Sequence, residues 1–316
     1  MPTMPFRAPD ARRSRAALIA IPLLIAACSG GTSSPPPVGS PGPSAATPSA
    51  APSVTPAPTV GAIEHKTGAT DVVLRLEEGG GFVPIDFLAS RAPTFTLYGD
   101  GIIVFQPKVE TFPQPDAAGV VHSIPWRTAK LDETQIQDLL AFALGAGGLG
   151  PARDSYIDGG IADAPNTIFT VRAGGLDKTV VINALGGDFG QGQPDAQARA
   201  SFLRLAERLR DFDNGGSIPT DVYTSDRYRG VLMEREAQPE PKPLAWPWPA
   251  LKATDFKAEQ TPDGGTSLPR RVLSTAEVDA LGIDDSVGGL QGIVLAGPDG
   301  KSYSLIVRPL LVEEKA

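Results

Sequence analysis

Apolar residues recur in short runs along the chain, a pattern typical of strands joined by tight turns. Val72 to Leu76 predicts one strand, and Arg229 to Met233 predicts another. Three pairs of short apolar runs flank glycine-rich turns, which is the signature of β-hairpins. The predicted hairpins cover 94–105 around Tyr98-Gly99-Asp100-Gly101, 167–184 around Gly174-Gly175, and 292–307 around Gly297-Pro298-Asp299-Gly300.

Two longer segments have the period of an α-helix. Asp132 to Leu144 begins with a capping box between Asp132 and Gln135, and Gly145 would end it. Asp195 to Arg210 is the second, and Ser274 would cap a short third helix that ends at Leu281. The predicted core faces are Ile136, Leu139, Leu140 and Ala143 in the first helix, and Ala198, Phe202, Leu205 and Leu209 in the second. We place four arginines on the polar side of the second helix, namely Arg199, Arg204, Arg208 and Arg210.

Hairpins with interspersed helices predict an α+β fold, in which an antiparallel sheet carries two or three helices. A regular strand–helix–strand alternation is missing, which argues against a doubly wound sheet. For the same reason a solute-binding receptor with two alternating lobes is disfavoured.

The first 27 residues differ from the rest of the chain. Arg7, Arg12, Arg13 and Arg15 precede twelve uncharged, mostly apolar residues from Ala16 to Ala27. Because a membrane-spanning helix needs about 20 apolar residues, this run is too short to span a bilayer. The layout is that of a secretory signal peptide.

Leu24-Ile25-Ala26-Ala27-Cys28 ends this run, and Cys28 is the single cysteine of the chain. The segment resembles the lipobox of bacterial lipoproteins. The resemblance implies that 1–27 is removed, that Cys28 carries lipid (diacylglycerol and palmitate), and that the protein is anchored in the cell membrane facing outside the cytoplasm. Two acyl chains hold a protein stably where one is marginal. The alternative is an ordinary secretory signal in which Cys28 is incidental.

Residues 29–61 contain no charged or aromatic residue, only Ser, Pro, Ala, Thr, Gly and Val. Such a segment cannot bury enough apolar surface to fold, so we expect a disordered tether over 28–61. We expect one globular extracytoplasmic domain over 62–316, with a potential sub-boundary at 239–249. Removing 1–27 leaves 28−4=24 basic and 35 acidic residues (36−1), a net charge of −11. This charge argues against a nucleic-acid partner.

Five prolines and two tryptophans, Trp246 and Trp248, fall within residues 239–249. No helix or central strand tolerates that proline content. The two indoles could form a shelf for a glycan or peptide. We favour a strap that clamps an extended segment onto the core and joins the C-terminal hairpin to the rest of the domain.

Candidate metal-binding and catalytic residues are sparse. Asp154, Asp158 and Asp163 surround two glycines and could hold a hard cation, although ordinary turn chemistry explains them better. Residues 211–216 imitate the start of a calcium loop, but Val222 stands where an EF-hand needs glutamate. The two histidines, His65 and His122, are too few for a histidine-rich zinc site. We therefore expect neither a metal nor a cofactor.

The globular part resembles a group of uncharacterised lipoproteins of GC-rich bacteria in three features. These are the Tyr98–Gly101 turn, Ala162-Asp163-Ala164 and Arg308-Pro309-Leu310-Leu311. This resemblance carries no activity. We therefore expect a lipid-anchored envelope protein with a non-enzymatic interaction or ligand-binding domain, whose protein, peptide or glycan partner the sequence does not identify. The alternative is an extracytoplasmic hydrolase with paired carboxylates, for which the candidate acids are Asp100, Asp163 and Asp188.

Overall fold

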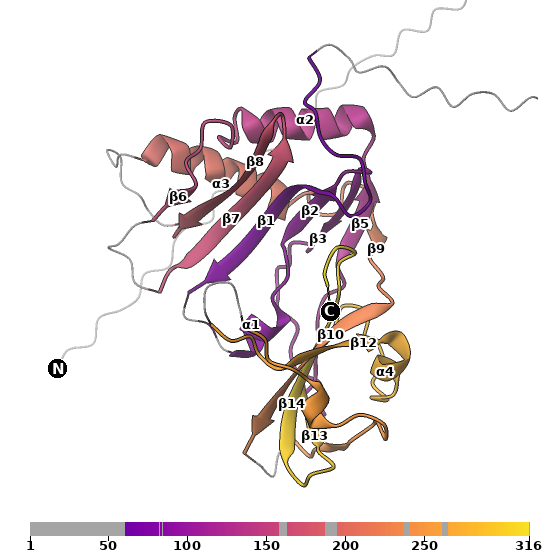
Figure 1. Cartoon of the computed structure of the whole chain (residues 1–316). Coiled ribbons are helices and arrows are strands. Elements are labelled where there is room, and N and C mark those ends of the chain that lie inside the picture. Colours follow the sequence, from indigo (N-terminus) through magenta and orange to yellow (C-terminus); the bar gives the residue numbers. More distant parts are fainter. Residues whose placement is uncertain are drawn as a thin grey trace, which may run out of the picture. The chain divides into compact units, whose positions relative to one another are not determined.

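The computed structural model describes residues 61–81, 83, 85–157, 163–186, 195–236, 241–260 and 265–315. Their fold is α+β, which confirms the predicted class, and the strands divide between two largely antiparallel sheets (Figure 1). The expected signal peptide, Cys28 and all of the expected tether but Gly61 lie outside these ranges. Within them, no helix has the length and apolar character needed to cross a membrane.

The larger sheet has eight strands in the order β6-β8-β7-β1-β2-β3-β5-β9. Two predicted hairpins, β2–β3 and β7–β8, lie in it, and β1 pairs with a strand of each. One pair, β6–β8, is parallel. The strands are β1 (Val72–Gly80), β2 (Phe95–Tyr98), β3 (Ile102–Phe105), β5 (Arg127–Lys130), β6 (Ser155–Tyr156), β7 (Pro165–Ala173), β8 (Leu176–Asn183) and β9 (Asp221–Val222).

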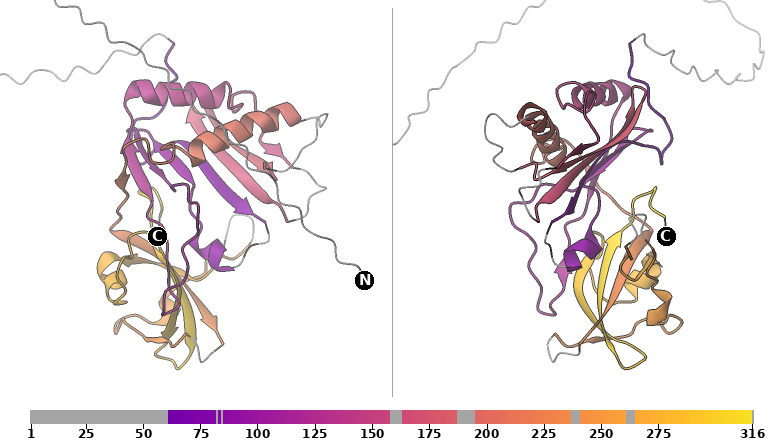
Figure 2. Two further views of the ribbon diagram at one scale, coloured as in Figure 1. Left: turned by 180° about the vertical axis from the view of Figure 1, so that it is seen from behind. Right: turned by 60° about the vertical axis from the view of Figure 1, so that its left-hand side comes forward.

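Two helices, α2 (Glu133–Leu144) and α3 (Ala196–Arg210), cover one face of this sheet (Figure 2). The predicted capping box is present, because Asp132 Oδ1 accepts the Gln135 N–H and Gln135 Oε1 accepts the Asp132 N–H. The predicted apolar faces of both helices pack into one cluster with the inner side chains of the sheet. The members that are completely buried include Leu74, Leu76, Phe95, Leu97, Ile103, Phe169, Leu140, Phe202, Leu205 and Leu209.

Arg199 does not lie on the polar side of α3, contrary to our expectation. The residue is only 6 % exposed, and its guanidinium donates to the backbone oxygens of Asn183 at 2.7 Å and Tyr156 at 3.0 Å. These carbonyls stand at the ends of β8 and β6. The helical period alone misplaced Arg199, because its acceptors come from strands more than ten residues away in sequence.

The smaller sheet runs β11-β13-β14-β10-β12, and β4 also pairs with β13. The predicted C-terminal hairpin is β13–β14, and Ser274 caps α4 as predicted. One face holds a core that includes Val278 of α4, and the other face contacts Ala89 of α1. The elements are α1 (Ile85–Ser90), β4 (Val121–His122), β10 (Arg227–Arg235), β11 (Leu244–Ala245), the 3-10 helix η1 (Ala253–Asp255), β12 (Arg270–Ser274), α4 (Thr275–Asp279), β13 (Leu290–Ala296) and β14 (Ser302–Pro309).

The described part of the proline-tryptophan segment, residues 241–249, lies against the smaller sheet. β11 pairs with β13 in parallel, and Trp248 is buried in that sheet's core at 4 % exposure. Its indole N–H donates to the Glu277 carbonyl at 2.7 Å. Because β10 precedes this segment and β12 to β14 follow it, the hydrogen bonds of one sheet join residues on both sides of 239–249.

Two adjacent glutamates near the C-terminus, Glu313 and Glu314, connect the two sheets. Glu314 accepts two hydrogen bonds from the buried guanidinium of Arg308, at 2.8 and 2.6 Å, and lies 3.3 Å from Arg229. Glu313 accepts from the Arg75 guanidinium and the Tyr98 hydroxyl. Arg308 and Arg229 belong to the smaller sheet, whereas Arg75 and Tyr98 belong to the larger one.

We predict that Trp248→Ala strongly destabilises the domain. The substitution leaves a cavity and an unpaired Glu277 carbonyl, and truncation of a buried tryptophan typically removes about 3–5 kcal/mol of unfolding free energy. Trp246→Ala is the matched control, because Trp246 is only half-buried. Chemical denaturation should show a clearly larger loss for Trp248→Ala, and equal losses would contradict the structure.

We predict that Glu314→Gln leaves the buried Arg308 and the partly buried Arg229 without their carboxylate and lowers the unfolding free energy by about 3–5 kcal/mol at pH 7. Burial raises the pKa of Glu314, but the Arg308 hydrogen bonds and the charges of Arg308 and Arg229 outweigh burial and hold that pKa below its usual 4.5. The stabilisation is therefore present above pH 4.5 and is lost as the pH falls through the lowered pKa. Denaturation between pH 7 and pH 3 tests this, with the exposed Glu236→Gln as control. A difference from wild type that does not shrink at low pH would refute the assignment.

Candidate functional site

The carboxylates suggested for a hydrolase do not come together in the described structure. Val72 at one end of β1 pairs with Tyr98, next to Asp100, and Gly80 at the other end pairs with Pro165, close to Asp163. Eight residue steps along a strand span about 26 Å. Glycosidase carboxylates lie about 5–10 Å apart, so Asp100 and Asp163 cannot form such a pair. Asp188 lies outside the described residues.

The suggested cation loop is only partly described. Asp154 and Asp163 are exposed, and Asp158 lies outside the described residues. Among the residues that the structure describes, no three His, Cys, Asp or Glu side chains are grouped as a metal site would require. In the calcium-like segment, Asp211 Oδ1 accepts the Gly215 N–H at 2.9 Å, and Asn214 has a φ of 50°. This geometry is that of a turn after α3, the interpretation that we favour from the sequence.

The indole N–H groups of the two tryptophans both donate hydrogen bonds to backbone carbonyls of the domain. Trp246 donates to the carbonyls of Trp248 at 3.0 Å and Leu251 at 2.9 Å, and its ring meets that of Trp248 edge-on at 5.2 Å. The buried Trp248 presents little surface to a ligand. This arrangement resembles the strap more than the open shelf.

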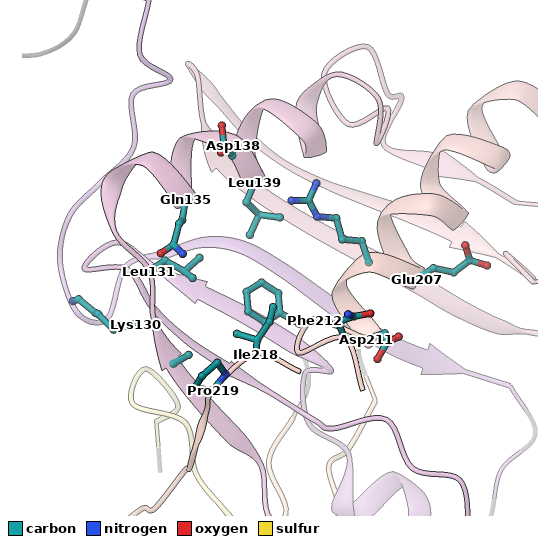
Figure 3. A pocket seen from close by; sticks show the side chains of 13 residues that line it. Lys130, Leu131, Gln135, Asp138, Leu139, Glu207, Asp211, Phe212, Ile218 and Pro219 are labelled. Carbon is teal, nitrogen blue, oxygen red and sulfur yellow. The ribbon is translucent and has the colours of Figure 1, made fainter. Parts of the chain in front are cut away.

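Two open hollows remain as candidate binding places. The first, which we call the α2–α3 hollow, has a volume of about 710 Å³ and lies where the start of α2 faces the end of α3 (Figure 3). Its apolar floor is formed by Leu131, Leu139, Phe212 and Ile218. Volumes of about 300–1,000 Å³ are typical of sites for small molecules.

Phe212 forms the floor because the chain turns sharply after α3. Its ring packs on the larger sheet, 5.2 Å from the Phe95 ring and 5.6 Å from the Phe105 ring. The turn then brings Ile218 back beside it with 41 % of its surface exposed. The sequence gives no signal for this hollow, since its lining comes from 129–139 and from 207–219.

The second hollow, which we call the strap hollow, has a volume of about 940 Å³ and lies between the 116–122 loop, residues 241–245 and the loop after α4. It contains His122, whose Nε2 lies 3.4 Å from Asp116 Oδ2 and whose Nδ1 lies 3.3 Å from the Asp285 carbonyl. Asp116 in turn accepts the N–H groups of Ala118 and Val120. Two polar side chains of this hollow, His122 and Asp116, therefore bind one another.

Both ring nitrogens of His122 face acceptors, which favours the imidazolium. The pKa of His122 therefore lies above its usual 6.5, mainly because of the hydrogen bond to the Asp285 carbonyl. Slight burial lowers this pKa, and the Asp116 carboxylate raises it further. The pKa of Asp116 lies below its usual value, mainly because its carboxylate accepts the Val120 N–H. Desolvation opposes this shift, and the Ala118 N–H and His122 add to it. The pair joins the 116–122 loop to the loop after α4.

We predict that His122→Gln destabilises the protein more at pH 5.5 than at pH 8.5. A raised pKa in the folded state means that the stabilisation is complete below pH 6.5 and is lost as the pH rises through the folded pKa. The ring is partly exposed, so the extra change in melting temperature should be small, of the order of 1–2 °C. Asp116→Asn should remove most of the same pH dependence. Equal losses at both pH values would contradict the assignment.

The second histidine, His65, takes part in neither hollow. Its Nδ1 lies 2.8 Å from the Lys66 carbonyl and its Nε2 lies 3.4 Å from Glu133 at the start of α2.

Comparison of the chain with protein-family models, with curated proteins and with solved structures finds no match.

Proposed function

We propose that this chain is a lipid-anchored protein of the cell envelope, whose α+β domain binds a ligand or partner outside the cytoplasm without catalysing a reaction. One observation carries the proposal. An arginine-rich start, a short apolar run and Leu24-Ile25-Ala26-Ala27-Cys28 follow one another directly before 33 residues without charge. A thiolate at that junction is the group that a diacylglyceryl transfer needs.

The attachment of the first described residues fits a domain held from its N-terminus. The N–H of Ile63 donates to Gln137 Oε1 at 2.7 Å, and Gln137 Nε2 returns a bond to the Ile63 carbonyl at 2.9 Å. The Gly174 N–H donates to the Glu64 carbonyl at 2.8 Å. These bonds fix the start of the domain against α2 and the β7–β8 turn.

The binding part of the proposal is supported by the two hollows, whose linings combine apolar and polar residues. Ligand sites usually have this composition, with a few polar groups that orient the ligand. A hydrolase would need two carboxylates at a fixed short distance, and the two described candidates stand at opposite ends of β1.

We predict that the mature chain begins at a lipid-modified Cys28. Mass spectrometry of the detergent-extracted protein should find a diacylglycerol-bearing N-terminal peptide and no peptide from 1–27. Cys28→Ala should lose this modification and keep its N-terminal segment, whereas the neighbouring Ser29→Ala should be processed normally. An unmodified Cys28 on a chain that retains Met1 would overturn the proposal.

A further inference from the structure

Arg208 differs from the other arginines of α3. Arg199 and Arg204 donate to backbone carbonyls, and Arg210 pairs with Glu78. Over the ranges that the structure describes, Arg208 has neither a hydrogen-bond acceptor nor a carboxylate within bonding distance. Its guanidinium lies over the Phe142 ring of α2, 4.4 Å from the ring centre. Stacking on an aromatic ring fixes the guanidinium plane and leaves its N–H donors free at the edge.

Arg208 lines the α2–α3 hollow together with the residues of its apolar floor. Ile218 is 41 % exposed, and Phe212, which lines the same hollow, packs on Phe95 of the larger sheet. A cation with free donors at the rim of an apolar hollow matches a molecule with one anionic end and one apolar end.

Gln135 adds a second donor to the rim. Its Oε1 is used by the capping box, while no acceptor for its Nε2 occurs in the described part of the chain. Its side chain lies beside Leu131 at the hollow (Figure 3). The amide is therefore a second donor at this rim, near the start of α2 and apart from the place where Arg208 lies over Phe142.

The remaining charges limit how many negative charges a ligand can carry. Two basic residues, Lys130 and Arg208, line the hollow together with three acidic ones, Asp138, Glu207 and Asp211, an excess of one negative charge (3−2=1). Lys130 is already bound to Asp100. The side chains of Asp138 and Glu207 point away from the floor (Figure 3). The net charge of the lining opposes a multiply charged anion, and only the position beside the Arg208 guanidinium favours a single carboxylate.

We infer that the α2–α3 hollow binds a small amphipathic monocarboxylate. The carboxylate accepts from the Arg208 guanidinium, and the apolar body packs on Phe212 and Ile218. This inference deepens the proposed binding function, because it names the ligand class and the residues that recognise it.

Three compounds with the same apolar body test the inference, namely 4-phenylbutyrate, 4-phenylbutanol and 4-phenylbutylamine. Calorimetric titration uses the full chain in dodecyl maltoside at pH 7.5, with empty micelles as the blank. A charge-assisted hydrogen bond to the carboxylate should make the butyrate bind about tenfold more tightly than the other two compounds. Arg208→Gln should reduce butyrate binding to the level of the alcohol, and Arg208→Lys should retain part of the preference.

Arg204→Gln, one turn earlier on α3, is the matched control and should keep the preference for the carboxylate. Ile218→Ser should weaken the binding of all three compounds alike. Thermal unfolding of Arg208→Gln should change only slightly, because Arg208 loses no hydrogen-bond acceptor and only its exposed contact with the Phe142 ring. The inference is overturned if no compound binds, if the three bind equally, or if Arg204→Gln acts like Arg208→Gln. A chain without lipid on Cys28 would refute the anchoring proposal but would leave this comparison of head groups intact.

Discussion

The pairing of Arg308 with Glu314 is the constraint on which the arrangement of the two sheets depends. The Arg308 side chain is only 4 % exposed, and a buried ion pair is strongly destabilised when the counter-charge is removed. Glu314 supplies that charge, so the chain must turn back after β14. The turn carries Glu313 to Arg75 and Tyr98 of the larger sheet, and the Leu310 carbonyl to the Tyr223 hydroxyl at 2.9 Å. Glu314 thus binds arginines of the smaller sheet, and the adjacent Glu313 binds residues of the larger sheet.

The elements that depend on neighbouring residues were predictable from the sequence. Asp132 with Gln135 and Ser274 with Glu277 form capping boxes, and the glycine-rich turns join the hairpins, because each signal acts within four residues or a single turn. The division into two sheets was not predictable. It requires β4, β10 and the last two strands to meet from distant parts of the chain, and two-residue strands such as β4 and β11 carry no periodic signal.

The candidate site was the least predictable part for the same physical reason. Residues 211–216 suggest a cation loop or a helix end when considered alone. In the fold, the same turn places Phe212 on Phe95 and Phe105, which creates the floor of the α2–α3 hollow. Arg208 follows the helical period onto the exposed side, as expected, but the importance of that position depends on Phe142 of another helix. The burial of Arg199 on the same helix depends on Tyr156 and Asn183.

Helix α2 contacts both the start of the described chain and the proposed binding site. Gln137 of α2 holds Ile63, where the described chain begins its contacts with the domain, and Gln135, Asp138 and Leu139 of the same helix line the α2–α3 hollow. The site therefore lies at the end of the domain that the N-terminal segment joins. For a flexible coil of 33 residues the end-to-end distance is about 30 Å, which is the separation between Cys28 and the domain that our proposal expects. If Cys28 is the anchor, the length of that segment sets how far from the membrane the hollow can meet its ligand.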